Sequence, residues 1–123
     1  MINYGKELIL DIHQCDSTKF NRKDLRKYFK QLCKLIDMKA EKLVFWDDVG
    51  VPEEFKQTEP HTKGTSAVQF ILTSNITVHT LDDLGNVYIN IFSCKDFDSD
   101  KALFFSVDYF EGKLSHWEVI KRV

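Results

Sequence analysis

The sequence predicts an α+β two-layer sandwich, in which a mainly antiparallel sheet carries two helices on one face. Three observations predict this fold. An amphipathic helix follows a first strand, four strands then come in succession, and a second helix precedes the last strand. Runs of strands with the helices set to one side are typical of α+β sandwiches. A chain of 123 residues fits a single domain, expected to span residues 1–123.

The first two elements differ in their hydrophobic period. Residues 5–13 hold a short apolar run that is typical of a buried strand. From Asn21 onward the apolar residues recur at spacings of three and four, which predicts an amphipathic helix. Asn21 can cap this helix, and Asp24 lies in the first turn, where a negative charge is favourable. The apolar stripe consists of Leu25, Tyr28, Phe29, Leu32, Cys33 and Ile36.

The middle of the chain is rich in strand patterns. The expected strands cover residues 42–46, 65–72, 76–81 and 87–92. The Ser74-Asn75 step separates the second of these strands from the third, and the sequence DDLGN at 82–86 is typical of a turn. Residues 47–63 hold both prolines and little pattern, and a stretch of that length is usually functional or mobile.

The C-terminal quarter completes the pattern. A short helix is expected from about Asp98, although Phe104, Phe105 and Val107 blur its period. The Glu111-Gly112 pair turns the chain, and the alternating segment KLSHWEVIK closes it as a last strand.

Composition and charge argue against several classes of protein. A net charge of −2 gives no basic footprint for nucleic acid or for an anionic membrane. No run of about 18 apolar residues exists, so no membrane span is expected. The N-terminal stretch has charges within its short apolar run and is not expected to be a secretory signal. The widely spaced Cys15, Cys33 and Cys94 indicate a reduced, cytoplasmic protein.

Three residues with reactive side chains occur in or beside the central strands. Ser74 lies between two strands, His79 follows within the next, and Cys94 ends the one after that. Taken singly, such residues are most often a turn serine, a partly buried histidine and a small buried thiol. Antiparallel pairing through the 82–86 turn allows the strand ends to bring them near one site. No metal site is expected, because His13, Cys15, His61 and Cys94 lack the usual spacing of zinc ligands.

Together these residues match a known family. The segment GTSAVQFILTSNITVHTLDDLGNVYINIFSC resembles the core of the prokaryotic S-adenosylmethionine decarboxylases, which are small pyruvoyl enzymes. The opening YGKELILDIHQCD and the DFDSDKA after Cys94 are similar to the same family. The resemblance covers nearly the whole chain. It is carried by the order and spacing of Gly64, Ser66, Ser74, His79, Thr80 and Cys94.

The resemblance implies an enzyme that makes its own cofactor. In this family the precursor cuts itself, here between Thr73 and Ser74, and the serine becomes a pyruvoyl group. The Ser74 hydroxyl attacks the carbonyl of residue 73, a base removes the α-proton of residue 74, and elimination followed by hydrolysis leaves a ketone. His79 matches the family's processing histidine, and the ordinary pKa of a histidine, near neutrality, suits that role. Ser66 matches a serine that assists processing.

The resemblance also implies the reaction. The keto group forms a Schiff base with the amine of S-adenosylmethionine and accepts electrons as CO₂ leaves, a step in polyamine (spermidine) biosynthesis. Cys94 matches the residue that returns a proton to the α-carbon, a role that a thiol with a reference pKa of about 8.5 can fill. The family builds its sites in a symmetric dimer, so a homodimer is expected.

The chain departs from the family at the cut and in the substrate pocket. Thr73 replaces a glutamate, Asn75 a common histidine, and Asn90 an aspartate. The sequence TLDD stands for the family's TWPE, and TEPH stands where the family has an aromatic-rich stretch that helps to hold adenine. Two alternatives therefore stay open: the same chemistry on another amino acid such as arginine or ornithine, and an uncleaved, non-catalytic relative.

Overall fold

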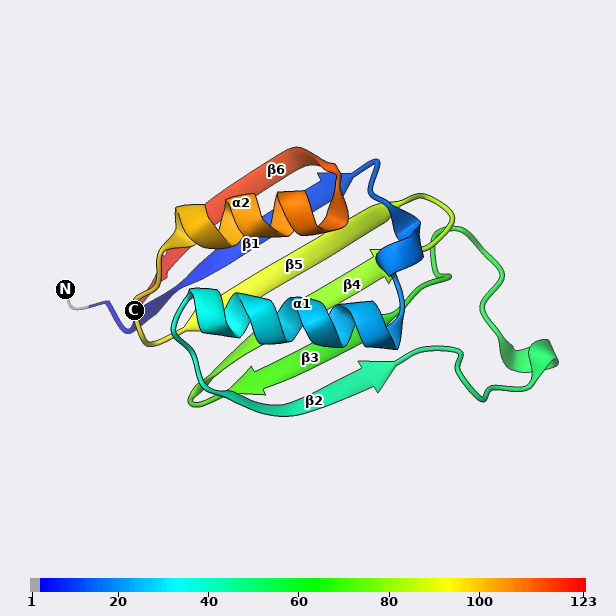
Figure 1. The fold of residues 1–123 in the computed structure, drawn as a ribbon, viewed down its shortest axis with the longest axis horizontal. Helices are drawn as coiled ribbons and strands as arrows, with labels where there is room; N and C mark the ends of the chain where they lie inside the picture. Colours follow the sequence, from blue (N-terminus) through cyan, green and yellow to red (C-terminus); the bar gives the residue numbers. More distant parts are fainter. Residues whose placement is uncertain (1–2) are drawn as a thin grey trace.

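A six-stranded antiparallel sheet with both helices on one face makes up the fold (Figure 1). The computed structural model describes residues 3–123. The strand order is β2-β3-β4-β5-β1-β6, which confirms the α+β sandwich. The elements are β1 (Gly5–His13), α1 (Arg22–Leu35), β2 (Ala40–Trp46), β3 (Ser66–Ile71), β4 (Ser74–Leu81), β5 (Asn86–Ser93), α2 (Ser99–Phe110) and β6 (Lys113–Arg122), with single 3₁₀ turns at Ser17–Lys19 and Glu53–Phe55.

The hairpin between β3 and β4 differs from the prediction. Ser74 and Asn75 were expected to separate the strands, but they are the first residues of β4, and Ser74 pairs with Ile71. The turn therefore consists of Leu72 and Thr73 alone. Of these two residues only Thr73 takes a positive φ, of 62°, which is the position where a type II turn requires one. Serine and asparagine favour turns by composition, but here Ser74 continues the buried face of the strand.

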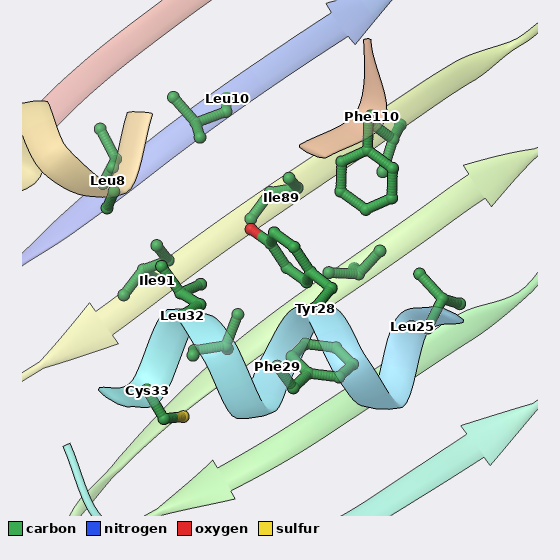
Figure 2. Packing of buried hydrophobic residues seen from close by; sticks show 14 of the residues in the cluster. Leu8, Leu10, Leu25, Tyr28, Phe29, Leu32, Cys33, Ile89, Ile91 and Phe110 are labelled. Carbon is green, nitrogen blue, oxygen red and sulfur yellow. The ribbon is translucent and has the colours of Figure 1, made fainter. Parts of the chain in front are cut away.

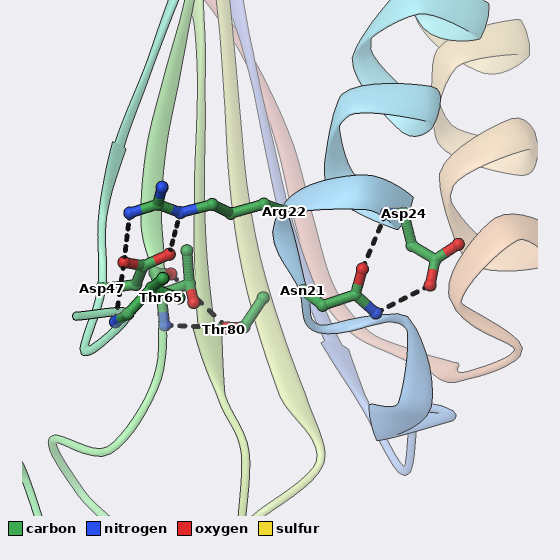
Figure 3. A network of polar contacts seen from close by, with 7 residues as sticks. Asn21, Arg22, Asp24, Asp47, Thr65 and Thr80 are labelled. Carbon is green, nitrogen blue, oxygen red and sulfur yellow. Dashed lines mark hydrogen bonds and ion pairs between the residues drawn. The ribbon is translucent and has the colours of Figure 1, made fainter.

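Helix α1 begins as its sequence indicates. The Asn21 side chain accepts a hydrogen bond from the Asp24 amide at 2.9 Å and donates one to the Asp24 carboxylate at 2.7 Å (Figure 3). The first of these bonds satisfies a backbone amide that has no partner within the helix. The expected stripe, from Leu25 to Cys33, is buried against the sheet (Figure 2). Each fully buried side chain of this size contributes roughly 1.5–3 kcal/mol relative to exposure.

Tyr28 lies at the centre of the core between the two helices. Its ring packs against Phe110 at a centroid distance of 4.9 Å and against Phe105 at 5.7 Å. Its hydroxyl is 2.7 Å from Ser106 Oγ, which in turn donates to the Ala102 carbonyl at 2.7 Å. Burial raises the pKa of Tyr28 well above its ordinary value, so the hydroxyl stays neutral and can donate to Ser106.

Removing either end of this hydrogen bond is expected to have unequal effects. Tyr28→Phe removes a donor while Ser106 keeps its bond to Ala102, so the free energy of unfolding should fall by about 1 kcal/mol. Ser106→Ala leaves the buried Tyr28 hydroxyl without its partner and should cost more, about 1–3 kcal/mol. Urea denaturation of both variants measures the difference. A larger loss in Tyr28→Phe would contradict this account.

The opposite face of the sheet is free of helices over residues 3–123 (Figure 1). Alternate residues of each central strand point to this face and stay partly exposed. Cross-strand pairs link five residues into one row on this face, in the order Asp11, Tyr88, His79, Ser66 and Trp46, the last of which lies on the edge strand β2 and is largely exposed. We call this helix-free face of the sheet the open face. Within the described residues, neither helix is long and apolar enough to cross a membrane.

Candidate active site

Thr73, Ser74 and Cys94 meet where the β3–β4 hairpin lies beside the end of β5. The register pairs Ser74 with Ser93, which puts Cys94 next to the hairpin turn. Thr73 Oγ1 lies 3.1 Å from Cys94 Sγ, and the sulfur lies 3.8 Å from the carbonyl oxygen of Thr73. The thiol therefore faces the peptide bond that joins Thr73 to Ser74.

Thr73 holds a backbone conformation that threonine rarely adopts. Its φ of 62° lies in the left-handed region, where the branched Cβ crowds the following carbonyl. Such a conformation costs an L-residue roughly 1–2 kcal/mol. The backbone strain is stored directly before the Thr73–Ser74 peptide bond, and strain of this kind clusters at functional sites.

Cys94 has the most acidic thiol of the three cysteines. The hydrogen bond between the Thr73 hydroxyl and the sulfur is the largest cause that lowers the pKa of Cys94, and desolvation partly opposes it. Burial raises the pKa of Cys15 and of Cys33 to about 11. Because reactivity follows the thiolate, Cys94 is the cysteine suited to proton exchange near neutral pH.

Ser74 points into the helix side of the sheet and is 8% exposed. Its hydroxyl donates to Ser93 Oγ at 3.0 Å, and Ser93 also accepts from the Lys95 amide at 3.0 Å. Ser93 is fully buried and was not singled out from the sequence. The sequence shows that Ser93 precedes Cys94, but the pairing of Ser93 with Ser74 depends on strand register.

His79 and Ser66 form a second cluster on the open face. Ser66 Oγ lies 2.8 Å from His79 Nδ1, and the two residues are direct cross-strand partners. On the other side, the His79 ring stacks with Tyr88 at a centroid distance of 6.5 Å. This contact between a hydroxyl and an imidazole can hold the ring in one orientation and leave Nε2 for proton transfer.

The two clusters do not meet within one chain. Ser74 and His79 stand five residues apart along β4, which corresponds to roughly 17 Å at about 3.4 Å per residue. An odd separation also sends the two side chains to opposite faces of the sheet. The expectation that the strand ends gather Ser74, His79 and Cys94 at one site is therefore wrong for a single chain.

The segment 47–63 borders a separate cavity. Arg22 of α1 makes a two-point ion pair with Asp47, at 2.6 and 2.7 Å, and so anchors the start of the segment (Figure 3). This pairing lowers the pKa of Asp47. Between the segment, the start of α1 and the end of β4 lies a cavity of about 750 Å³. Pro60 and His61 are exposed and are not among the residues that line this cavity.

A family model for S-adenosylmethionine decarboxylase matches residues 6–123. The chain belongs to the S-adenosylmethionine decarboxylase family. The crystal structure of the adenosylmethionine decarboxylase from Aquifex aeolicus VF5 is similar, with a TM-score of 0.76, 17% identity, and coverage of 99% of this chain and 92% of that one. No curated protein matches the sequence.

Membership in the S-adenosylmethionine decarboxylase family confirms the resemblance drawn from the motifs and makes this chain a decarboxylase. At 17% identity the Aquifex structure supports the fold alone, and it shares the two helices and the antiparallel sheet. The roles of Ser66, Ser74, His79 and Cys94 in this chain remain predictions.

Proposed function

We propose that this chain is a pyruvoyl-dependent decarboxylase of S-adenosylmethionine in polyamine (spermidine) synthesis, and that it cleaves itself between Thr73 and Ser74. One observation carries the proposal: a serine hydroxyl follows a strained peptide carbonyl that faces a thiol of lowered pKa. Three unpaired cysteines support a cytoplasmic site of action, where thiols stay reduced.

Self-cleavage follows from the groups at the hairpin. Ser74 Oγ attacks the carbonyl carbon of Thr73, the C–N bond breaks, and the hydroxyl proton passes to the nitrogen, which leaves an ester. Cys94 Sγ lies 3.8 Å from the carbonyl oxygen and can donate to it as negative charge develops there. Loss of the Ser74 α-proton then expels the Thr73 carboxylate, and water replaces the nitrogen with an oxygen while ammonia departs.

The residues present fit a pyruvoyl group. Ser74 supplies its three carbons, and Thr73, which replaces the family's glutamate, offers the carbonyl that the acyl shift needs. When formed, the group supplies an electron sink for loss of the substrate carboxylate. Cys94 then returns a proton to the substrate carbon, with its thiol held by the Thr73 hydroxyl.

A homodimer would unite the two clusters. The open face is uncovered in one chain, and His79 and Ser66 lie on it, away from Ser74. A two-fold axis between two open faces can place the strands of the two chains in opposite directions. The hairpin end of β4 in one chain would then lie against the far end of β4 in the partner. The partner subunit's His79 would then lie across the open face from the hairpin, beside the backbone of Ser74, and would take the α-proton there, while the Ser74 hydroxyl points to the helix side.

Intact mass tests the proposal. Purified protein is expected to contain two chains, residues 1–73 and 74–123, and the second should react with hydroxylamine and resist Edman chemistry. Ser74→Ala should stay a single full-length chain without decarboxylase activity. A wild-type chain that remains whole after long incubation, or a second chain with a free serine N-terminus, would refute self-processing to a pyruvoyl group.

A further inference from the structure

Tyr4 and Cys94 border the same cavity. This cavity, of about 420 Å³, lies where the start of β1 meets the end of β5 and the last residues of β6. It is separate from the larger cavity beside the segment 47–63. Its walls are formed by Asn3, Tyr4, Gly5, Lys6, Cys94, Asp96, Val119 and Lys121.

Gly5 brings the two side chains together. A Cβ at position 5 would collide with the carbonyl oxygen of Ser93 and with Cys94 Cα, so only glycine lets the backbones approach this closely. As a result, the residue directly before Gly5 lies beside Cys94. The Gly5 position thus sets the distance between Tyr4 and the thiol.

Tyr4 is also held on two further sides. Its amide donates to the Arg122 carbonyl at 2.7 Å. Its ring stacks on Phe92 with a centroid distance of 6.2 Å and an interplanar angle of 21°. Its side chain is nevertheless open to water, since the residue is 56% exposed. A tyrosine whose ring is held in place and whose hydroxyl is accessible to solvent can hydrogen-bond to a neighbouring thiol and exchange protons with water.

We propose that the Tyr4 hydroxyl donates a hydrogen bond to Cys94 Sγ and is a positioning residue for the proton transfer by this thiol. The inference rests on the proposed function of Cys94. When the thiol gives its proton to the substrate carbon, the S–H bond breaks, a C–H bond forms and a thiolate remains. The Tyr4 O–H donates to that thiolate and stabilises it until a solvent proton replaces the one lost.

The acid–base behaviour of the pair agrees with this geometry. The bond to Cys94 is the largest cause of a raised pKa at Tyr4, since a donor to a thiolate resists ionisation. The same bond contributes to the lowered pKa of Cys94, after the larger effect of Thr73. Each group therefore shifts in the direction that a phenol–thiolate hydrogen bond requires.

Tyr4→Phe tests the proposal, because it removes the hydroxyl and keeps the ring against Phe92. The rate of iodoacetamide alkylation is measured against pH, with the modified residue identified by mass. The midpoint for Cys94 is expected at higher pH in the variant, and alkylation at neutral pH should be at least about threefold slower, because less thiolate is present. Tyr109→Phe, whose hydroxyl instead bonds the Asp24 carbonyl, is the matched control and should leave the midpoint unchanged.

A reciprocal measurement needs no change at Tyr4. In Cys94→Ala, ultraviolet titration should show one tyrosine ionising at lower pH than in the wild type. Unchanged midpoints in both experiments would overturn the proposal. Both work on cut or uncut protein, so failure of self-cleavage, seen by intact mass, is distinguishable from failure of the Tyr4 bond.

Discussion

Cys94→Ser is expected to give a protein that still cleaves itself but decarboxylates S-adenosylmethionine roughly 10²–10⁴ times more slowly, the usual range for loss of a positioned proton-transfer group. Serine keeps a donor near the Thr73 carbonyl, so the acyl shift can proceed. Its hydroxyl, however, is a far weaker acid than a thiol with a reference pKa of about 8.5. Protonation of the substrate carbon would then be slow.

The measurement compares kcat for CO₂ release, normalised to the cleaved fraction found by mass. Cys15→Ala is the control, because Cys15 is partly buried away from the hairpin and its pKa is raised to about 11. It should retain wild-type kcat. A Cys94→Ser enzyme that is fully cleaved and fully active would remove Cys94 from the chemistry.

Mixing two inactive variants is expected to restore cleavage. In a co-expressed pair, the Ser74→Ala chain keeps His79 and the His79→Ala chain keeps Ser74. If the partner subunit's His79 serves Ser74, every mixed dimer holds one complete site, and random assortment puts about half of the His79→Ala chains in such dimers. Up to that share should be cut, whereas His79→Ala alone should stay whole.

Chain-specific tags allow mass spectrometry to follow each chain. The matched control pairs His79→Ala with the double variant Ser74→Ala/His79→Ala, which offers no histidine and should give no cleavage. Cleavage equal to that of His79→Ala alone in both mixtures would mean that the site is not shared between subunits, and the proposed dimer would have to be abandoned.

The elements of this fold could be predicted because local pattern and tertiary packing agree. The stripe from Leu25 to Ile36 and the cap at Asn21 specify α1, and Asp98 caps α2 as its position indicates. The alternation in 87–92 likewise gave β5 to within one residue at each end. The family motif supplied the candidate residues, since no local period marks a reactive serine.

The arrangement of the site could not be predicted in the same way. A threonine gives no sign of a left-handed φ, so the turn was misplaced onto Ser74 and Asn75. Ser93 and Tyr4 owe their importance to strand register and to the close approach at Gly5, which pair residues far apart in sequence. The separation of His79 from Ser74 follows from strand parity and became evident once β4 was known to begin at Ser74.

The left-handed backbone at Thr73 has a consequence for how the protein matures. An unfolded chain does not hold Thr73 in this conformation, so the distortion arises only once the β3–β4 hairpin has formed, and Cys94 reaches it only when β5 pairs with β4. Under the proposed chemistry, chain scission would then report that folding is complete. A misfolded chain would keep its peptide bond and stay inactive, so the hairpin would couple activation to correct folding.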